Sequence, residues 1–197
     1  MYFCLASTIQ YQEILRTARK ILWYLSPILL SAPAFSAQFT LASRDFTNNG
    51  FVSRRYEYRG FGCHGQNVSP ELSWTGVPRG TTTFILTVFD RSAVRLTKSG
   101  WWHWVVFNIP VSVHRLPEDA SLRGLPRGAV EGRTDYGSIG YGGPCPPKGG
   151  PAHQYVFTLY ALTRRLSLSA GATGAEVTYM ARQDAIGRAH LVARFKR

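Results

Sequence analysis

Apolar side chains come in short runs whose lengths suit strands rather than helices. Residues 81–89, 101–109 and 155–162 are rich in β-branched and aromatic side chains, and Gly, Pro or polar segments separate them. This composition predicts three long strands, of which 81–89 and 155–162 are central in a sheet. Shorter strands are predicted at residues 39–43, 71–74 and 189–195, where apolar and polar positions alternate or a turn signal follows.

One segment near the end of the chain has helical character. Thr173 is followed three residues later by Glu176, which is the pattern of a capping box, and apolar positions then recur at helical spacing. We therefore predict a helix over residues 174–186. Many strands, one late helix and frequent turns predict an all-β fold, an antiparallel β-sandwich with a C-terminal helix and short helical or loop segments.

The first residues have the pattern of an export signal. Arg16, Arg19 and Lys20 precede an apolar run at residues 21–30, and small side chains dominate residues 31–37. A secretory signal peptide typically has a basic segment, then a short apolar segment, and then a cleavage region of small residues. The run is short for an uninterrupted membrane span.

We accordingly expect residues 1–37 to be a signal peptide and residues 38–197 to be one mature domain, periplasmic or secreted. Cleavage is expected near residues 34–37, after one of Ala34, Ser36 and Ala37. An uncleaved anchor is the alternative. Residues 1–15 carry Glu13 and little apolar character, which also fits an over-extended start.

The chain is strongly basic, with a formal net charge of +12. Residues 38–197 keep 20 basic and 10 acidic residues, so the excess belongs to the expected mature domain. Such a charge favours contact with anionic surfaces. The basic residues are scattered, as in the pairs at 54–55, 164–165 and 196–197, which indicates solvated surface charge and no nucleic-acid partner.

Two of the three cysteines remain after the leader. Cys63 and Cys145 make an even number of cysteines in a chain that we expect to reach an oxidising compartment, and this favours a disulfide between them. A thiol nucleophile with His153 as its base is the alternative for Cys145. The segment Gly-Ser-Ile-Gly at residues 137–140 is not the Gly-x-Ser-x-Gly motif of a serine hydrolase.

Candidate chemistry gathers around two strand ends and a rigid loop. The two strands at 84–90 and 100–110 deliver Asp90 and His103, and a Gly/Pro loop at residues 140–150 leads to His153. Polar side chains at strand ends beside a loop of fixed shape predict a pocket. A zinc site of the Asp and both His is the alternative, although no short-spaced ligand pair supports it.

Several motifs in order resemble the phosphatidylethanolamine-binding protein family, in its bacterial Raf-kinase-inhibitor-like branch. They are Gly-Phe-Gly-Cys at 60–63, Asn-Val-Ser-Pro-Glu-Leu-Ser-Trp at 67–74, residues 100–110, Pro-Pro-Lys-Gly at 146–149 and His-Gln-Tyr at 153–155. The resemblance covers about residues 39–195. It implies an antiparallel β-sandwich with a small anion-binding pocket, which agrees with the strand pattern.

The resemblance also implies which side chains line that pocket. They are Asp90, Trp101, His103, Pro147, His153 and Tyr155. Two imidazoles can donate N–H groups to a phosphate or a carboxylate, and a neighbouring Asp can hold one ring in a given tautomer or protonated. Aromatic rings and prolines would exclude water and so strengthen each polar contact.

The chain departs from the family at the end of the first strand. The family usually reads Asp-Pro-Asp-Ala-Pro there, whereas residues 90–94 are Asp-Arg-Ser-Ala-Val. The first acid is kept, the second is Ser92, and both prolines are lost. Arg91 is either an added cation at the pocket rim or a partner of Asp90. Gln154 replaces the usual Arg, which removes an expected salt bridge.

Together these features predict an exported, non-enzymatic binding or regulatory protein that holds phosphate or a phospho-headgroup. Two alternatives stay open: a secreted inhibitor or interaction protein that acts through its surface, and a hydrolase or transferase that uses His103, His153 and Asp90. We expect no cofactor and no bound metal. The sequence leaves three kinds of partner open: a small anion or phospholipid headgroup, a protein partner, and a second copy of the chain. We expect no stable membrane span after cleavage.

Overall fold

The computed structural model describes residues 37–197. Residues 1–36 of the predicted signal peptide lie outside the described residues, and the signal peptide and its cleavage sites stay predictions. Within residues 37–197, no helix is long and apolar enough to cross a membrane.

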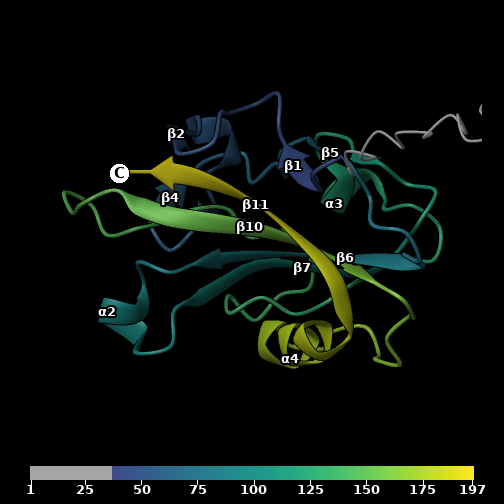
Figure 1. The fold of residues 1–197 in the computed structure, drawn as a ribbon. Helices are drawn as coiled ribbons and strands as arrows, with labels where there is room; N and C mark the ends of the chain where they lie inside the picture. The colour runs from purple at the N-terminus through teal and green to yellow at the C-terminus, as the bar shows by residue number, and fades with distance from the viewer. Residues whose placement is uncertain (1–36) are drawn as a thin grey trace, which may run out of the picture. The chain divides into compact units, whose positions relative to one another are not determined.

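A six-stranded sheet forms the centre of the domain (Figure 1). Its order is β2 (Gly50–Phe51), β11 (Ala185–Phe195), β10 (His153–Leu162), β6 (Thr83–Asp90), β7 (Trp101–Pro110) and β9 (Val130–Glu131). Neighbouring strands are antiparallel except for β11 and β2, which pair in parallel. The three long strands predicted from their apolar runs are thus β6, β7 and β10.

A smaller sheet and a helix cover the two faces of this central sheet. The smaller sheet has the order β1 (Thr40–Ala42), β5 (Leu72–Thr75) and β8 (Arg115–Leu116), and a separate hairpin pairs β3 (Arg59–Gly60) with β4 (Cys63–His64). Helix α4 (Gly174–Asp184) lies across the sheet from β1 and β5 (Figure 1). Short helical turns complete the chain: η1 (Arg54–Tyr56), α2 (Val94–Thr97) and α3 (Ala120–Arg123).

The side chains of β6 alternate between two hydrophobic cores. Phe84 and Leu86 pack in the core shared with Trp74 of the smaller sheet, whereas Ile85 packs with Val177 of α4. All five are buried. Since both faces of β6 lie against apolar neighbours, its sequence is mostly apolar and does not alternate between apolar and polar side chains. The predicted β-sandwich with a C-terminal helix is confirmed.

The capping box predicted at the start of α4 is present. The Thr173 hydroxyl accepts a hydrogen bond from the backbone N–H of Glu176, and the Glu176 carboxylate accepts one from the backbone N–H of Thr173. The predicted helix end at residue 186 is wrong by two residues. The helix ends at Asp184, and Ala185 already has extended backbone angles as the first residue of β11.

Candidate functional site

A cavity of about 290 Å³ opens where β6, β7 and β10 meet the Gly/Pro loop. Antiparallel pairing brings the strand ends together, because Asp90 at the end of β6 faces both Trp101 of β7 and Tyr155 of β10. The lining includes five predicted site residues: Asp90, Trp101, His103, Pro147 and His153. The structure therefore gathers into one place residues that are up to 63 positions apart in sequence.

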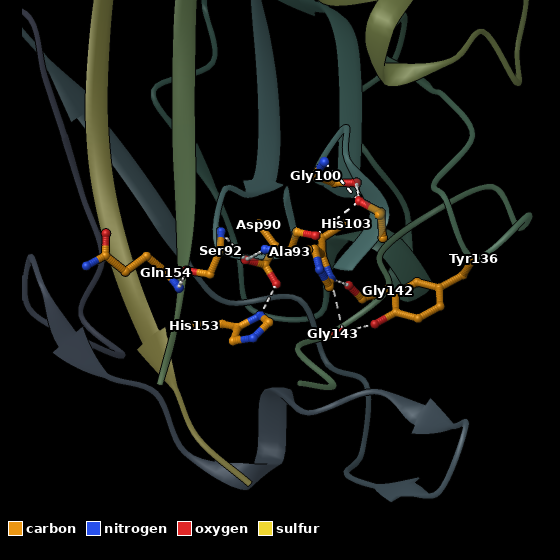
Figure 2. Close-up of polar contacts among 11 residues, drawn as sticks. Asp90, Ser92, Ala93, Gly100, His103, Tyr136, Gly142, Gly143, His153 and Gln154 are labelled. Carbon is orange, nitrogen blue, oxygen red and sulfur yellow. Dashed lines mark hydrogen bonds and ion pairs between the residues drawn. The ribbon is translucent and has the colours of Figure 1, made fainter. Parts of the chain in front are cut away.

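Asp90 and His153 form a buried ion pair (Figure 2). Oδ2 of Asp90 lies 2.6 Å from Nδ1 of His153, and the two side chains are 5% and 8% exposed. Oδ1 accepts hydrogen bonds from the backbone N–H groups of Ser92 (2.8 Å) and Ala93 (3.2 Å). A carboxylate can only accept, so Nδ1 of His153 carries the proton. Asp90 thus orients the ring and keeps a proton on Nδ1.

His103 has a different environment (Figure 2). Its Nδ1 lies 2.7 Å from the carbonyl oxygen of Gly142 and 3.1 Å from that of Gly143, so Nδ1 carries the proton there too. Burial lowers the pKa of His103 to about 4. The ring is therefore neutral near pH 7, and Nε2 is an acceptor. In this neutral form His103 differs from the expectation that both imidazoles donate N–H groups into the pocket, and that expectation stays a prediction for His153.

The loop that holds His103 is fixed by side chains from distant segments. The amide of Asn67 donates to the Tyr141 carbonyl (3.0 Å) and accepts from the Gly143 N–H (2.8 Å). The Tyr136 hydroxyl donates to the carbonyl of Gly143 at 2.9 Å. A Cβ at Gly143 would come within 2.0 Å of the Tyr56 carbonyl oxygen, so the close packing of this loop needs glycine there.

Two predicted site residues lie away from the open cavity. Tyr155 packs edge-on against His103, with ring centroids 4.9 Å apart, and lines a small void beneath it. Burial raises the pKa of the Tyr155 hydroxyl. Arg91 hydrogen-bonds the side chain of Gln154 and lines a neighbouring surface depression. Arg91 thus pairs with the residue that replaces the family's arginine instead of with Asp90, whose ion pair is with His153.

Other cavity residues were not anticipated from the sequence. Tyr136, Arg197 and the exposed apolar side chains of Phe61 and Leu96 all line it. From the sequence alone, Arg197 is one of the scattered surface charges. Phe195 of β11 pairs with His153 of β10, so Arg197, two residues after Phe195, lies at the cavity. No local sequence signal indicates this register.

The disulfide predicted between Cys63 and Cys145 is confirmed. The two Cα atoms lie 6.0 Å apart, and the bridge joins β4 to the Gly/Pro loop. Cys145 lines the cavity, so the bridge is part of its wall. A guanidinium nitrogen of Arg197 lies 2.8 Å from Sγ of Cys63 and 3.5 Å from Sγ of Cys145.

The zinc alternative gains no geometric support. In the part of the chain from residue 37 onward, no three His, Cys, Asp or Glu side chains are arranged to hold a metal ion. Both oxygens of Asp90 already accept hydrogen bonds from protein groups, and Nδ1 of each histidine donates within the protein.

His103 should make the stability of the domain depend on pH. Its folded pKa is about 4 and its unfolded value is about 6.5, so the unfolded chain binds more protons between these values. The stabilisation is complete above pH 6.5 and is lost as the pH falls toward 4. We expect the free energy of unfolding to drop by about 2 kcal/mol between pH 6.5 and pH 5 from this group.

Urea denaturation across this pH range measures the loss, and long-range ¹H–¹⁵N spectra report the protonation state of the ring. His114 is exposed, so His114→Ala is a matched control that should keep the same pH dependence. A His103 ring that is already protonated at pH 6 in the folded protein would contradict the prediction.

Comparisons with known proteins agree with the fold and the motifs. The family model described as "Phosphatidylethanolamine-binding protein" matches residues 42–196. The Escherichia coli protein YbcL is 44% identical over 170 residues, which cover 83% of this chain and 92% of that protein. LppC of Mycobacterium tuberculosis, whose name describes a candidate lipoprotein, is 37% identical over 168 residues, or 84% of this chain and 77% of that protein.

Solved structures show the same similarity. The crystal structure of E. coli YbcL has a TM-score of 0.78 at 42% identity and covers 82% of this chain and 99% of that one. A structure of the homologue CT736 from Chlamydia trachomatis has a TM-score of 0.69 at 30% identity, with 81% and 98% covered. Because the family model matches most of this chain and these relatives align along the same residues, the chain belongs to the phosphatidylethanolamine-binding protein family.

Proposed function

We propose that the chain is an exported, non-enzymatic binding protein whose cavity holds phosphate or a similar small phospho-anion. One observation carries this proposal: the Asp90–His153 pair lies at the wall of an open cavity whose lining includes aromatic rings and prolines. An imidazolium held there by a buried carboxylate can donate its remaining N–H to an anion. Hydrogen bonds that involve charged groups are about twice as strong as neutral ones.

The charges around the cavity favour an anion of low charge. Asp90 and a protonated His153 neutralise each other, His103 is neutral, and the guanidinium of Arg197 adds one positive charge. Water is partly excluded by Trp101 and Tyr136, which strengthens each of these electrostatic contacts.

The absence of an enzymatic activity is proposed because the thiol and the hydroxyl groups that line the cavity are already engaged. Cys145 is bridged and so is no free thiol. The hydroxyl of Thr97 bonds backbone groups of Ala93 and Gly100, and that of Tyr136 donates to Gly143. Neither hydroxyl has a histidine as its hydrogen-bonded base, which an activated nucleophile needs.

A surface function is the second candidate, and one observation favours it. Phe61 and Leu96, which are 74% and 62% exposed, flank the cavity with apolar side chains. Such residues fit a protein partner that contacts the cavity mouth. A secreted inhibitor would use this surface, and so would a homodimer. The two candidates are compatible, because a bound anion could complete the partner's surface.

Titration calorimetry of residues 38–197 with inorganic phosphate tests the proposal. We expect a single saturable site, and we expect the tryptophan fluorescence to change on binding because the Trp101 ring lines the cavity. The control is His114→Ala, which removes an exposed imidazole and should leave the affinity unchanged. No binding at millimolar phosphate would reject an anion-binding function and leave the surface function as the better candidate.

We further expect the mature chain to begin between Ala32 and Gln38 and to be found outside the cytoplasm. The basic and apolar segments before residue 31 support this, and so does the name of the relative LppC, which indicates a lipoprotein. N-terminal sequencing of the chain recovered from a periplasmic or culture fraction measures it. Recovery of a chain with residues 16–30 intact would contradict the cleaved signal peptide.

A further inference from the structure

The hydrogen bonds of His103 determine which of its nitrogens can meet a ligand. Nδ1 donates to the carbonyl oxygens of Gly142 and Gly143, which accept only. Nε2 has no hydrogen-bond partner among residues 37–197, and it is not one of the buried polar atoms sealed from solvent. Since His103 lines the cavity, the lone pair of Nε2 is available there. A neutral His103 can therefore accept a hydrogen bond from a ligand but cannot donate one.

His153 differs because a carboxylate faces its Nδ1. Nδ1 of His153 donates to Asp90, and in the imidazolium form Nε2 of His153 donates as well. The cavity thus combines an acceptor on β7 with a charged donor on β10. An anion that carries no proton would place an oxygen lone pair against the lone pair of His103. An anion with one O–H group would satisfy both rings.

From this arrangement we propose that His103 makes the cavity selective for phospho-anions that still carry an acidic proton. The O–H group donates to Nε2 of His103, and an unprotonated oxygen accepts from Nε2 of His153. This inference rests on the proposed anion-binding function and deepens it. The ligand class is free hydrogen phosphate or a protonated phosphomonoester, and it excludes phosphodiesters such as an intact phospholipid headgroup.

The candidate ligands differ in whether they carry an acidic proton near neutral pH. Inorganic phosphate keeps at least one proton throughout the range from about pH 5 to pH 8. A phosphomonoester loses its last proton with a pKa of about 6. Phosphodiesters and sulfate carry none in this range. A buried acceptor that a ligand leaves unsatisfied weakens binding by roughly 5- to 150-fold.

Other titrating groups around His103 act on all of these ligands alike. Those that face it are Asp90, His153, Tyr136, Tyr155 and, across the cavity, Arg197. The ratio of two affinities at one pH therefore isolates the contribution of His103.

The test is a calorimetric titration of the wild-type protein with inorganic phosphate, methyl phosphate, dimethyl phosphate and sulfate in a buffer without phosphate. At pH 7 we expect dimethyl phosphate and sulfate to bind roughly 5- to 150-fold more weakly than inorganic phosphate. From pH 5 to pH 8, methyl phosphate should lose affinity relative to inorganic phosphate. The affinities for phosphoethanolamine, a monoester, and for vesicles with phosphatidylethanolamine, a diester, then distinguish a free ligand from a lipid headgroup.

The variant His103→Gln provides an amide that can turn its N–H₂ group to the ligand. We expect the preference for phosphate over sulfate to fall toward unity in this variant, whereas His114→Gln should keep the wild-type ratio. Spectra of the phosphate complex should show Nε2 of His103 without a covalent proton. These readouts do not depend on one another, so a His103→Gln chain that fails to fold still leaves the wild-type ligand series and the spectra decisive.

Equal affinities for inorganic phosphate, dimethyl phosphate and sulfate would overturn the inference and leave the anion-binding function intact. A doubly protonated His103 in the complex would also overturn it, because the ring would then be a donor. If none of the four anions binds, the proposed function falls and the inference falls with it.

Discussion

Replacement of both His103 and His153 by alanine is expected to abolish measurable binding of inorganic phosphate. Both imidazoles line the cavity, and small apolar side chains would replace them. His153→Ala alone removes the charged donor and should weaken binding by about 10- to 150-fold, or 1.5–3 kcal/mol. Titration calorimetry at pH 6.5 measures both losses.

Variants of matched size separate a site effect from loss of the fold. His153→Gln keeps a donor for Asp90, so the buried carboxylate stays hydrogen-bonded while the charged donor is lost. Arg197→Ala removes a cation that lines the cavity, and Arg91→Ala removes one that bonds Gln154 instead. We expect weaker binding from Arg197→Ala and no change from Arg91→Ala. Equal phosphate affinity in the wild type and the double histidine variant would end the hypothesis of this site.

Loss of the Cys63–Cys145 disulfide should lower the free energy of unfolding by about 4–5 kcal/mol. The bridge joins residues 82 positions apart, so it restricts a long loop in the unfolded chain. In the chain-entropy model the stabilisation grows slowly with loop length, and this loop lies near the upper end. Urea denaturation of Cys63→Ala/Cys145→Ala, compared with the oxidised and reduced wild type, measures it.

The same variant should also weaken phosphate binding, because Cys145 lines the cavity and Arg197 lies against both sulfurs. The matched control is Thr173→Ala at the start of α4. This variant should lower stability by about 1 kcal/mol through loss of the cap, with no effect on affinity. A cysteine variant as stable as the wild type would contradict the structural role of the bridge.

The local sequence pattern was sufficient to predict an element wherever the same packing or the same short-range hydrogen bonds repeat along it. The apolar runs of β6, β7 and β10 predicted strands because each is buried on both faces. The capping box predicted the start of α4, since its two hydrogen bonds join residues only three apart. The end of α4 was misplaced by two residues because Ala185 and Ile186 suit either a helix or a strand, and pairing of Ala185 with Leu162 decides it.

The sequence alone also determined the chemistry that the chain can bring together: one acid, two histidines, a stiff Gly/Pro loop and a cysteine pair. Tertiary structure decided what each group does. Asn67 fixes a loop 74 or more positions away, and the carbonyl oxygens of that loop set the tautomer of His103. The β10–β11 register delivers Arg197 to the cavity. Whether an imidazole donates or accepts depends on the partner that its other nitrogen meets, and only the folded chain provides that partner.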